Sequence, residues 1–200
     1  MDSAAAAGPA LGSTRRELVA VSQHRKYNSA PMTANELFSA MSPSLAVRIL
    51  EDLHTADKDL YRVTLHSVAQ ARKVRPVFLE RQPKADRHRV MATALGQRSL
   101  EMIAGNVLSG WLVKNQGALL AEFLDALKIP HDKGVVEDLP KTVPDEALDA
   151  AVEGLLAKHE PEVVAIYLHA FNGMNDANWP HLHEILHTDP KLQLGSTPSQ

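Results

Sequence analysis

The segment His183-Glu184-Ile185-Leu186-His187 places two histidines four residues apart, with a glutamate directly after the first. In a helix, residues four apart lie one turn apart on the same face, so the two imidazoles can reach a single metal ion. Imidazole nitrogens are common zinc ligands, and a zinc-bound water is a nucleophile at neutral pH. The spacing is therefore compatible with metal-dependent hydrolysis.

Over these five residues the chain resembles the H-E-x-x-H motif of the zincin family. The resemblance implies that His183 and His187 are zinc ligands. It also implies that Glu184 is the general base that takes a proton from the metal-bound water. It extends no further along the chain, so no zincin fold is implied.

A catalytic zinc needs a third protein ligand, and the sequence supplies none in the expected place. The residue six positions after His187, where the longer zincin pattern has a ligand, is Gln193. Asp176 or His169 could serve from upstream, although that order would be unlike the family. With ten histidines in the chain, a spacing of four also arises by chance. An ordinary amphipathic surface helix is the competing interpretation.

Basic residues cluster in the middle of the chain. Residues 62–121 contain ten lysines or arginines against three acids, whereas residues 122–200 contain five against fourteen. The densest part, here called the basic strip, consists of Arg72, Lys73, Arg75, Arg81, Lys84, Arg87 and Arg89. Such clustering is typical of surfaces that bind phosphates, including those of nucleic acids.

A competing interpretation is that the basic strip is solvated or lies against the acidic last third of the chain. The net charge of -3 and the sequence pI of about 6.4 favour this interpretation, because nucleic-acid-binding domains are usually basic overall. Phe78 is the one aromatic residue among these cations, which gives little support to the binding of single strands.

Apolar residues recur at every third or fourth position from Thr33 onward, the period of amphipathic helices. Thr33 with Glu36 has the spacing of a capping box, and Ser42 before Pro43 is a second helix start. The pattern predicts nine helices and no strand: two that begin after Thr33 and after Ser42, and others over 57–73, 84–95, 99–113, 118–127, 145–158, 162–171 and 178–187.

The sequence thus predicts an all-α fold, a compact multi-helix bundle, with a stack of helical hairpins as the alternative. The helix over 99–113 carries apolar residues almost all round, so we expect it at the centre of the core. Residues 1–31 are rich in Ala, Gly, Ser and Pro and are expected to form a flexible arm. Residues 32–190 would form the single domain, and residues 191–200 a flexible tail.

Composition excludes several classes of site. The chain has no cysteine, so disulfides, thiolate zinc sites and cysteine nucleophiles are excluded, which fits the reducing cytoplasm. The sequence shows neither a secretion signal nor an apolar run long enough to cross a membrane. Glycine-rich nucleotide loops and the G-x-S-x-G motif are absent as well.

The sequence-based expectation is a cytoplasmic helical interaction or regulatory module that binds a protein partner and carries no cofactor. The alternatives are a metal-dependent hydrolase with zinc at His183 and His187, and a nucleic-acid binder that uses the basic strip. An exposed apolar patch would favour the first interpretation. A third ligand near the two histidines would favour the second, and a continuous positive face the third.

Overall fold

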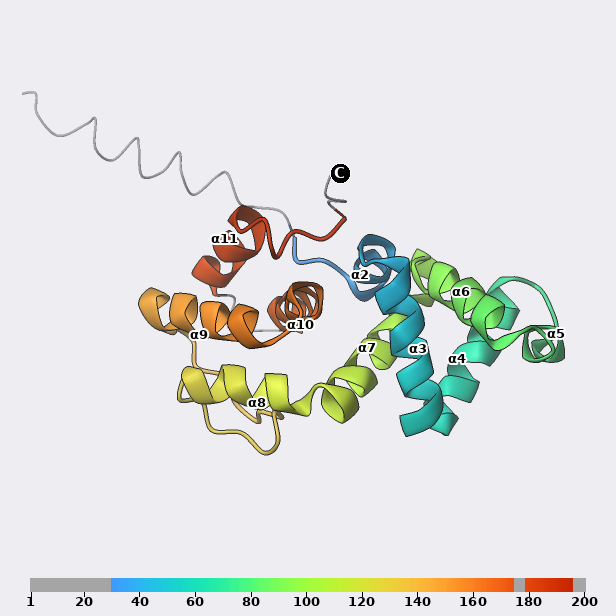
Figure 1. The fold of residues 1–200 in the computed structure, drawn as a ribbon, viewed down its shortest axis with the longest axis horizontal. Coiled ribbons are helices and arrows are strands. Elements are labelled where there is room, and N and C mark those ends of the chain that lie inside the picture. The colour runs from blue at the N-terminus through green and yellow to red at the C-terminus, as the bar shows by residue number, and fades with distance from the viewer. Residues whose placement is uncertain (1–29, 175–178, 196–200) are drawn as a thin grey trace, which may run out of the picture. The chain divides into compact units, whose positions relative to one another are not determined.

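The computed structural model describes residues 30–174 and 179–195 of the chain, and residues from Pro31 onward belong to one packed unit (Figure 1). Within the described residues the regular elements are all helices and none is a strand, which confirms the predicted all-α bundle. Almost all of the arm predicted for residues 1–31 lies outside the described residues. No helix in the described part is both long and apolar enough to cross a bilayer.

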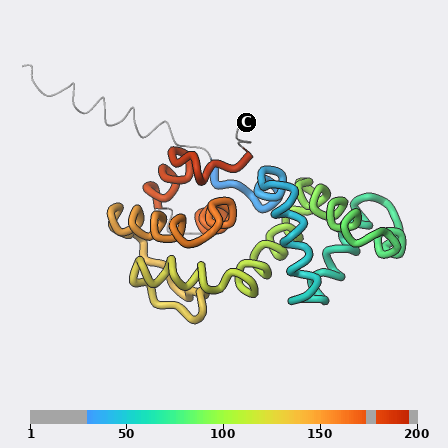
Figure 2. Tube along the Cα trace, viewed as in Figure 1, coloured from blue at the N-terminus to red at the C-terminus, as the bar shows by residue number. Residues whose placement is uncertain are grey.

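Ten α-helices and one 3₁₀ helix make up the described unit, and the tube in Figure 2 follows their order. The helices of the first half are α2 (Ala34–Ala40), α3 (Pro43–Ala56), α4 (Lys58–Ala71), α5 (Pro76–Glu80), α6 (Lys84–Leu95), η1 (Arg98–Leu100) and α7 (Glu101–Asn115). Those of the second half are α8 (Gly117–Ala126), α9 (Asp145–Lys158), α10 (Pro161–Met174) and α11 (Pro180–Thr188).

Helix starts in the first half lie where the sequence signals predict them. The Thr33 N–H donates a hydrogen bond of 2.8 Å to the Glu36 carboxylate at the start of α2. The Leu45 N–H donates one of 3.2 Å to the Ser42 hydroxyl at the start of α3. Each bond satisfies a backbone donor that the first turn of a helix otherwise leaves unpaired, which fixes where the helix begins.

Helix α7 joins the two halves, since it packs against α2, α3 and α4 and continues into α8 (Figure 1). Trp111 lies fully buried on its inner side and donates a 2.9 Å hydrogen bond from Nε1 to Asp52 of α3. The prediction that this helix lies at the centre of the core is wrong in part, because its apolar residues Met102 and Val113 are exposed. The neighbouring helices cover one side of α7 and leave the other in water.

Two segments that connect the longer helices differ in structure, since one forms a short helix and the other a loop. Residues 76–80 form the one-turn helix α5, in which only Leu79 is buried. Residues 128–144 form an irregular loop, in which Asp132 and Val135 pair through two backbone hydrogen bonds of 2.9 Å. At the end of the chain Leu192 is buried, so the packed region continues past residue 190.

Candidate functional site

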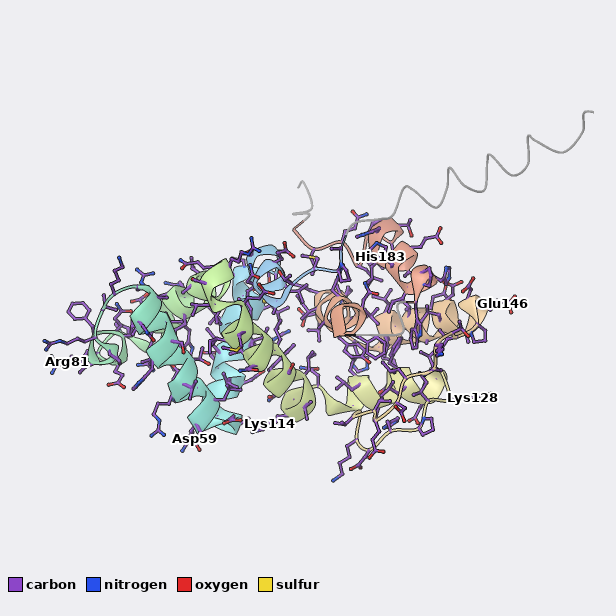
Figure 3. All side chains as sticks on the ribbon, turned by 180° about the vertical axis from the view of Figure 1, so that it is seen from behind. Asp59, Arg81, Lys114, Lys128, Glu146 and His183 are labelled. Atoms are coloured by element: carbon purple, nitrogen blue, oxygen red, sulfur yellow. The ribbon has the colours of Figure 1, made fainter. Side chains whose placement is uncertain are left out.

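The basic strip lies on the part of the chain that runs from the end of α4 through α5 into α6. Figure 3 shows Arg81 at the α5 end of the unit, with its side chain pointing outward. All seven side chains are exposed except Arg87, which is half-buried. Within the described residues, none of them pairs with an acid from 122–200. The interpretation in which the strip lies against the acidic last third therefore finds no support in these contacts.

Two cations of the strip are paired with acids of the first half of the chain. The Lys84 ammonium lies 3.6 Å from the Glu51 carboxylate of α3. The Arg89 guanidinium lies 3.0 Å from Asp86, one helical turn earlier. Both pairs are exposed, so each adds little to stability. They also leave these two cations less available to a partner.

Arg87 has a structural role, because it ties α6 to α4 and α5. Its Nε donates a 2.9 Å hydrogen bond to the Tyr61 hydroxyl, and a terminal nitrogen donates one of 2.9 Å to the Glu80 carbonyl. The second bond satisfies a carbonyl at the end of α5 and fixes where that short helix sits. Arg87 therefore positions the strip and is not a candidate contact.

The other four cations have no ion pair or side-chain hydrogen bond to any described residue, and they share the segment 72–81 with three exposed apolar side chains. We call this surface the cationic–apolar surface, and it consists of Val74, Val77, Phe78, Arg72, Lys73, Arg75 and Arg81. Phe78 is 68% exposed. Large apolar side chains that gather on a surface are typical of interaction sites, whereas isolated ones are ordinary.

Local backbone geometry keeps this surface in water. Lys73 ends α4 in the left-handed conformation with φ of 56°, and the Val74 N–H closes the helix with a 2.9 Å bond to the Ala69 carbonyl. Pro76 then starts α5, which is one turn long. A single turn can direct only one of its apolar residues inward, and that residue is Leu79. Its neighbours Val77 and Phe78 face solvent for this reason.

Sequence reasoning placed the cations of this surface but missed its apolar part. The helices predicted from the sequence leave residues 74–83 unassigned, so the exposure of Val77 and Phe78 was not predicted. The sequence feature that identifies this surface is a short segment with three apolar residues, because a segment of that length cannot bury all three. Basic residues on both sides of such a segment strengthen that signal, because they keep it solvated.

Beneath the strip, His88 is completely buried against α3 and α4. Its Nε2 lies 3.0 Å from the Tyr61 hydroxyl, and its Nδ1 has no hydrogen-bond partner among the described residues. Burial is the main cause that lowers the pKa of His88 to about 4, and the positive charges of Arg87 and Lys84 act in the same direction. The imidazole is therefore neutral in the folded protein at neutral pH.

The free energy of unfolding should fall as the pH is lowered from about 6.5 toward 4. In this window an unfolded chain, with the ordinary histidine pKa of about 6.5, takes up a proton that buried His88 does not accept. His88→Gln cannot take up that proton and should show a shallower decline. Urea unfolding across this pH range measures both slopes, and equal slopes in the two proteins would show that His88 does not control the decline.

The predicted metal ligands lie together on α11. The rings of His183 and His187 are 4.3 Å apart between centroids and nearly perpendicular. His183 Nδ1 lies 3.5 Å from the Asn172 amide, and its Nε2 is buried without a hydrogen-bond partner in the described part of the chain. Burial lowers the pKa of His187, and His183 beside it adds to the shift.

The other groups of the hydrolase interpretation are directed elsewhere. The Glu184 carboxylate is exposed and lies 3.5 Å from His181 Nδ1. His169 directs its Nε2 to the Leu192 carbonyl at 3.2 Å, and Asp176 lies outside the described residues. No set of three or more His, Asp or Glu side chains within 30–174 and 179–195 is arranged to hold a metal. Zinc binding at His183 and His187 therefore stays a prediction.

Comparison of the chain with models of known protein families, with curated proteins and with solved structures found no match. Function must therefore be inferred from side chains and their surroundings. Of the predicted sites, the cationic–apolar surface is the one whose charged groups are exposed and without partners in the described structure.

Proposed function

We propose that the protein is a helical interaction module that binds an acidic, partly apolar segment of a partner protein on the cationic–apolar surface. The observation that carries the proposal is the exposure of Phe78 among four cations that have no ion-pair partner in the described residues. A partner segment with carboxylates around an apolar centre would match this surface in both charge and polarity.

The chemistry of the surface is that of protein interfaces. Aromatic residues and arginine are enriched where interfaces contribute most binding energy, because they bury a large area and make directed polar contacts. Phe78 supplies the aromatic centre, and Val74 and Val77 extend it. The arginines and the lysine at the edge would steer a negatively charged partner and fix its orientation.

A protein partner fits this surface better than a nucleic acid. Three apolar side chains lie among the cations, whereas nucleic-acid surfaces need cations to track phosphates and aromatic rings to stack on bases. Only one aromatic ring is present here, and the chain as a whole carries a net charge of -3. Repulsion from the acidic remainder of the chain opposes binding of a long polyanion.

A random peptide library displayed on phage, selected against the full chain, tests the proposal without knowledge of the partner. Selected peptides should combine Asp or Glu with Leu, Phe or Trp, and their affinity should fall as salt rises. Lys73→Gly should weaken binding about threefold, as expected for one exposed charge pair. Since glycine adopts the left-handed conformation freely, this variant should fold as well as the unchanged protein.

Lys128→Gly is the matched control. Lys128 is also an exposed lysine in the left-handed conformation, with φ of 57°, just after a helix end, but it lies after α8. Its replacement should leave peptide binding unchanged. Selection of peptides without acidic residues, or an equal loss in both variants, would overturn the proposal. So would tight binding of oligothymidylate or polyuridylate that the selected peptides fail to displace, which would indicate a nucleic-acid surface instead.

A further inference from the structure

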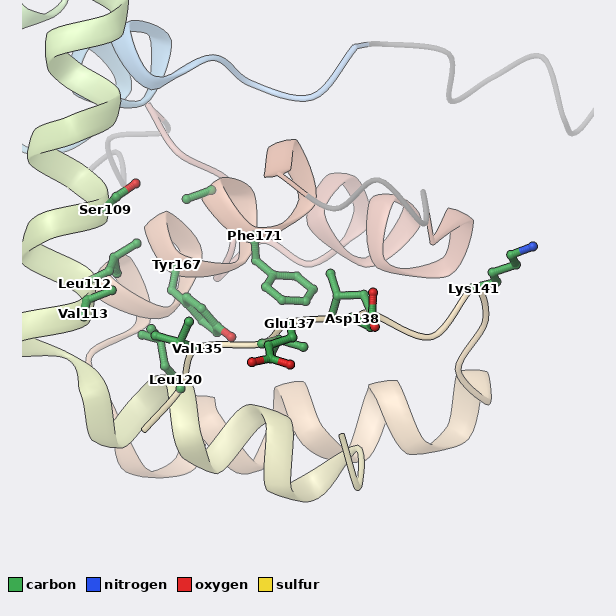
Figure 4. Close-up of a pocket in the computed structure, with 14 residues that line it drawn as sticks. Ser109, Leu112, Val113, Leu120, Val135, Glu137, Asp138, Lys141, Tyr167 and Phe171 are labelled. Carbon is green, nitrogen blue, oxygen red and sulfur yellow. The ribbon is translucent and has the colours of Figure 1, made fainter. Parts of the chain in front are cut away.

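A cavity of ≈ 570 Å³ lies beneath the loop over 134–141, between that loop and the helices α7, α8 and α10 (Figure 4). Its walls are mainly apolar and include Leu112, Leu120, Val136, Leu139 and Phe171. Pockets that hold small organic ligands have volumes of about 300–1,000 Å³ and walls of this kind. The cavity therefore has the size and lining of a ligand site.

Tyr167 is the most deeply placed polar residue of this cavity, with only 4% of its surface exposed. Its hydroxyl makes no hydrogen bond to any described residue, and burial raises the pKa of the group, which keeps it protonated. The ring is held by edge-on packing against Phe123, at 5.5 Å between centroids. The hydroxyl therefore has hydrogen-bonding capacity left for a bound molecule.

The rim of the cavity is acidic. Glu137 and Asp138 line it, are exposed, and have no ion-pair partner within the described residues. The cation that also lines it, Lys141, points away from the other lining side chains in Figure 4. Val113 and Val135 add exposed apolar surface at the same place. The cavity thus offers an apolar interior below a negatively charged opening.

We propose that this cavity binds a small apolar amine. The apolar body of the ligand would pack against Leu112, Leu120 and Phe171, and the ammonium group would lie at the carboxylates of Glu137 and Asp138. The Tyr167 hydroxyl oxygen would accept a hydrogen bond from the ammonium group. An anionic ligand of the same shape would be repelled at the opening. This site is separate from the cationic–apolar surface, so the two proposals stand or fall independently.

Three probes of equal shape test the assignment: phenylpropylamine, phenylpropanol and phenylpropionate. They differ in charge at one end, and each is added to the full chain while the methyl signals of Val113, Leu120 and Val135 are followed by NMR. The amine should shift these signals and bind about tenfold more tightly than the alcohol, as expected for a charged hydrogen bond. The propionate should bind most weakly.

Two variants locate the contacts. Glu137→Gln should weaken amine binding about threefold or more, whereas Glu146→Gln, at an exposed position of α9 outside the cavity (Figure 3), should leave it unchanged. Tyr167→Phe keeps the ring, should fold as well as the unchanged protein, and should weaken binding. Equal affinity for amine and alcohol, equal effects of the two glutamate variants, or no shift at the cavity with any probe would overturn the proposal.

Discussion

Replacement of Phe78 by serine will weaken the binding of the selected acidic peptides about thirtyfold or more. Central aromatic residues of interfaces contribute about 2 kcal/mol or more when truncated, and about 1.4 kcal/mol corresponds to a factor of ten in affinity. Phe78 is the largest apolar group of the cationic–apolar surface and is 68% exposed in the described structure. Binding would bury much of that area, and serine cannot replace it.

The exposure of Phe78 also makes this variant a clean test, because few of its contacts hold the fold together. The free energy of unfolding should change by no more than about 0.5 kcal/mol. Met102→Ser is the matched control, since Met102 is 77% exposed on α7 and lies outside the surface. Peptide affinity, measured by fluorescence anisotropy, should be unchanged in that control. An equal loss in both variants would show that the peptides bind through unspecific apolar contact.

Replacement of Trp111 by alanine will lower the free energy of unfolding by about 3–5 kcal/mol, the range found for large aromatic side chains in protein cores. Trp111 is completely buried and belongs to α7, the helix that joins the two halves of the unit. The change removes an indole ring from the core and also the 2.9 Å hydrogen bond to Asp52 of α3. A cavity between α7 and α3 would remain.

Trp111→Phe separates the two contributions, because it keeps most of the apolar volume and removes the hydrogen bond. Its cost should be well below that of the alanine variant. Urea unfolding followed by far-UV circular dichroism measures both. A loss of about 0.5 kcal/mol or less in Trp111→Ala, the range of surface substitutions, would contradict the central position of α7 in the core.

The helices were predictable because their signals are local. Capping residues such as Thr33 and Ser42 act within one turn, and the apolar period of each helix is determined by the face it buries. Helices α6 and α9 begin and end where the sequence predicts. The exposure of Met102 and Val113 was not predictable, because it depends on which neighbours cover α7. The apolar period of a helix shows which residues share a face, but not which neighbouring helices cover that face.

The charged residues of the site could be predicted from the sequence, but the arrangement of its side chains could not. Sequence clustering identified Arg72, Lys73, Arg75 and Arg81, but it could not show that Arg87 is held by Tyr61 and Glu80. Those contacts depend on tertiary packing. The same holds for the histidine cluster, where the spacing of His183 and His187 is local but the orientation of Glu184 toward His181 is not. The cavity at Tyr167 is lined by residues from three helices and a loop, so no pattern within one segment of the sequence predicts it.

The most direct test of the cationic–apolar surface compares two amphipathic peptides of identical apolar pattern, one built with glutamate and the other with lysine. Each is added to the full chain at low and at high salt while the methyl signals of Val74 and Val77 are followed by NMR. We expect only the glutamate peptide to shift these signals, with an affinity that falls as salt rises. Equal shifts by both peptides, or shifts by the lysine peptide alone, would contradict an acidic partner at this surface.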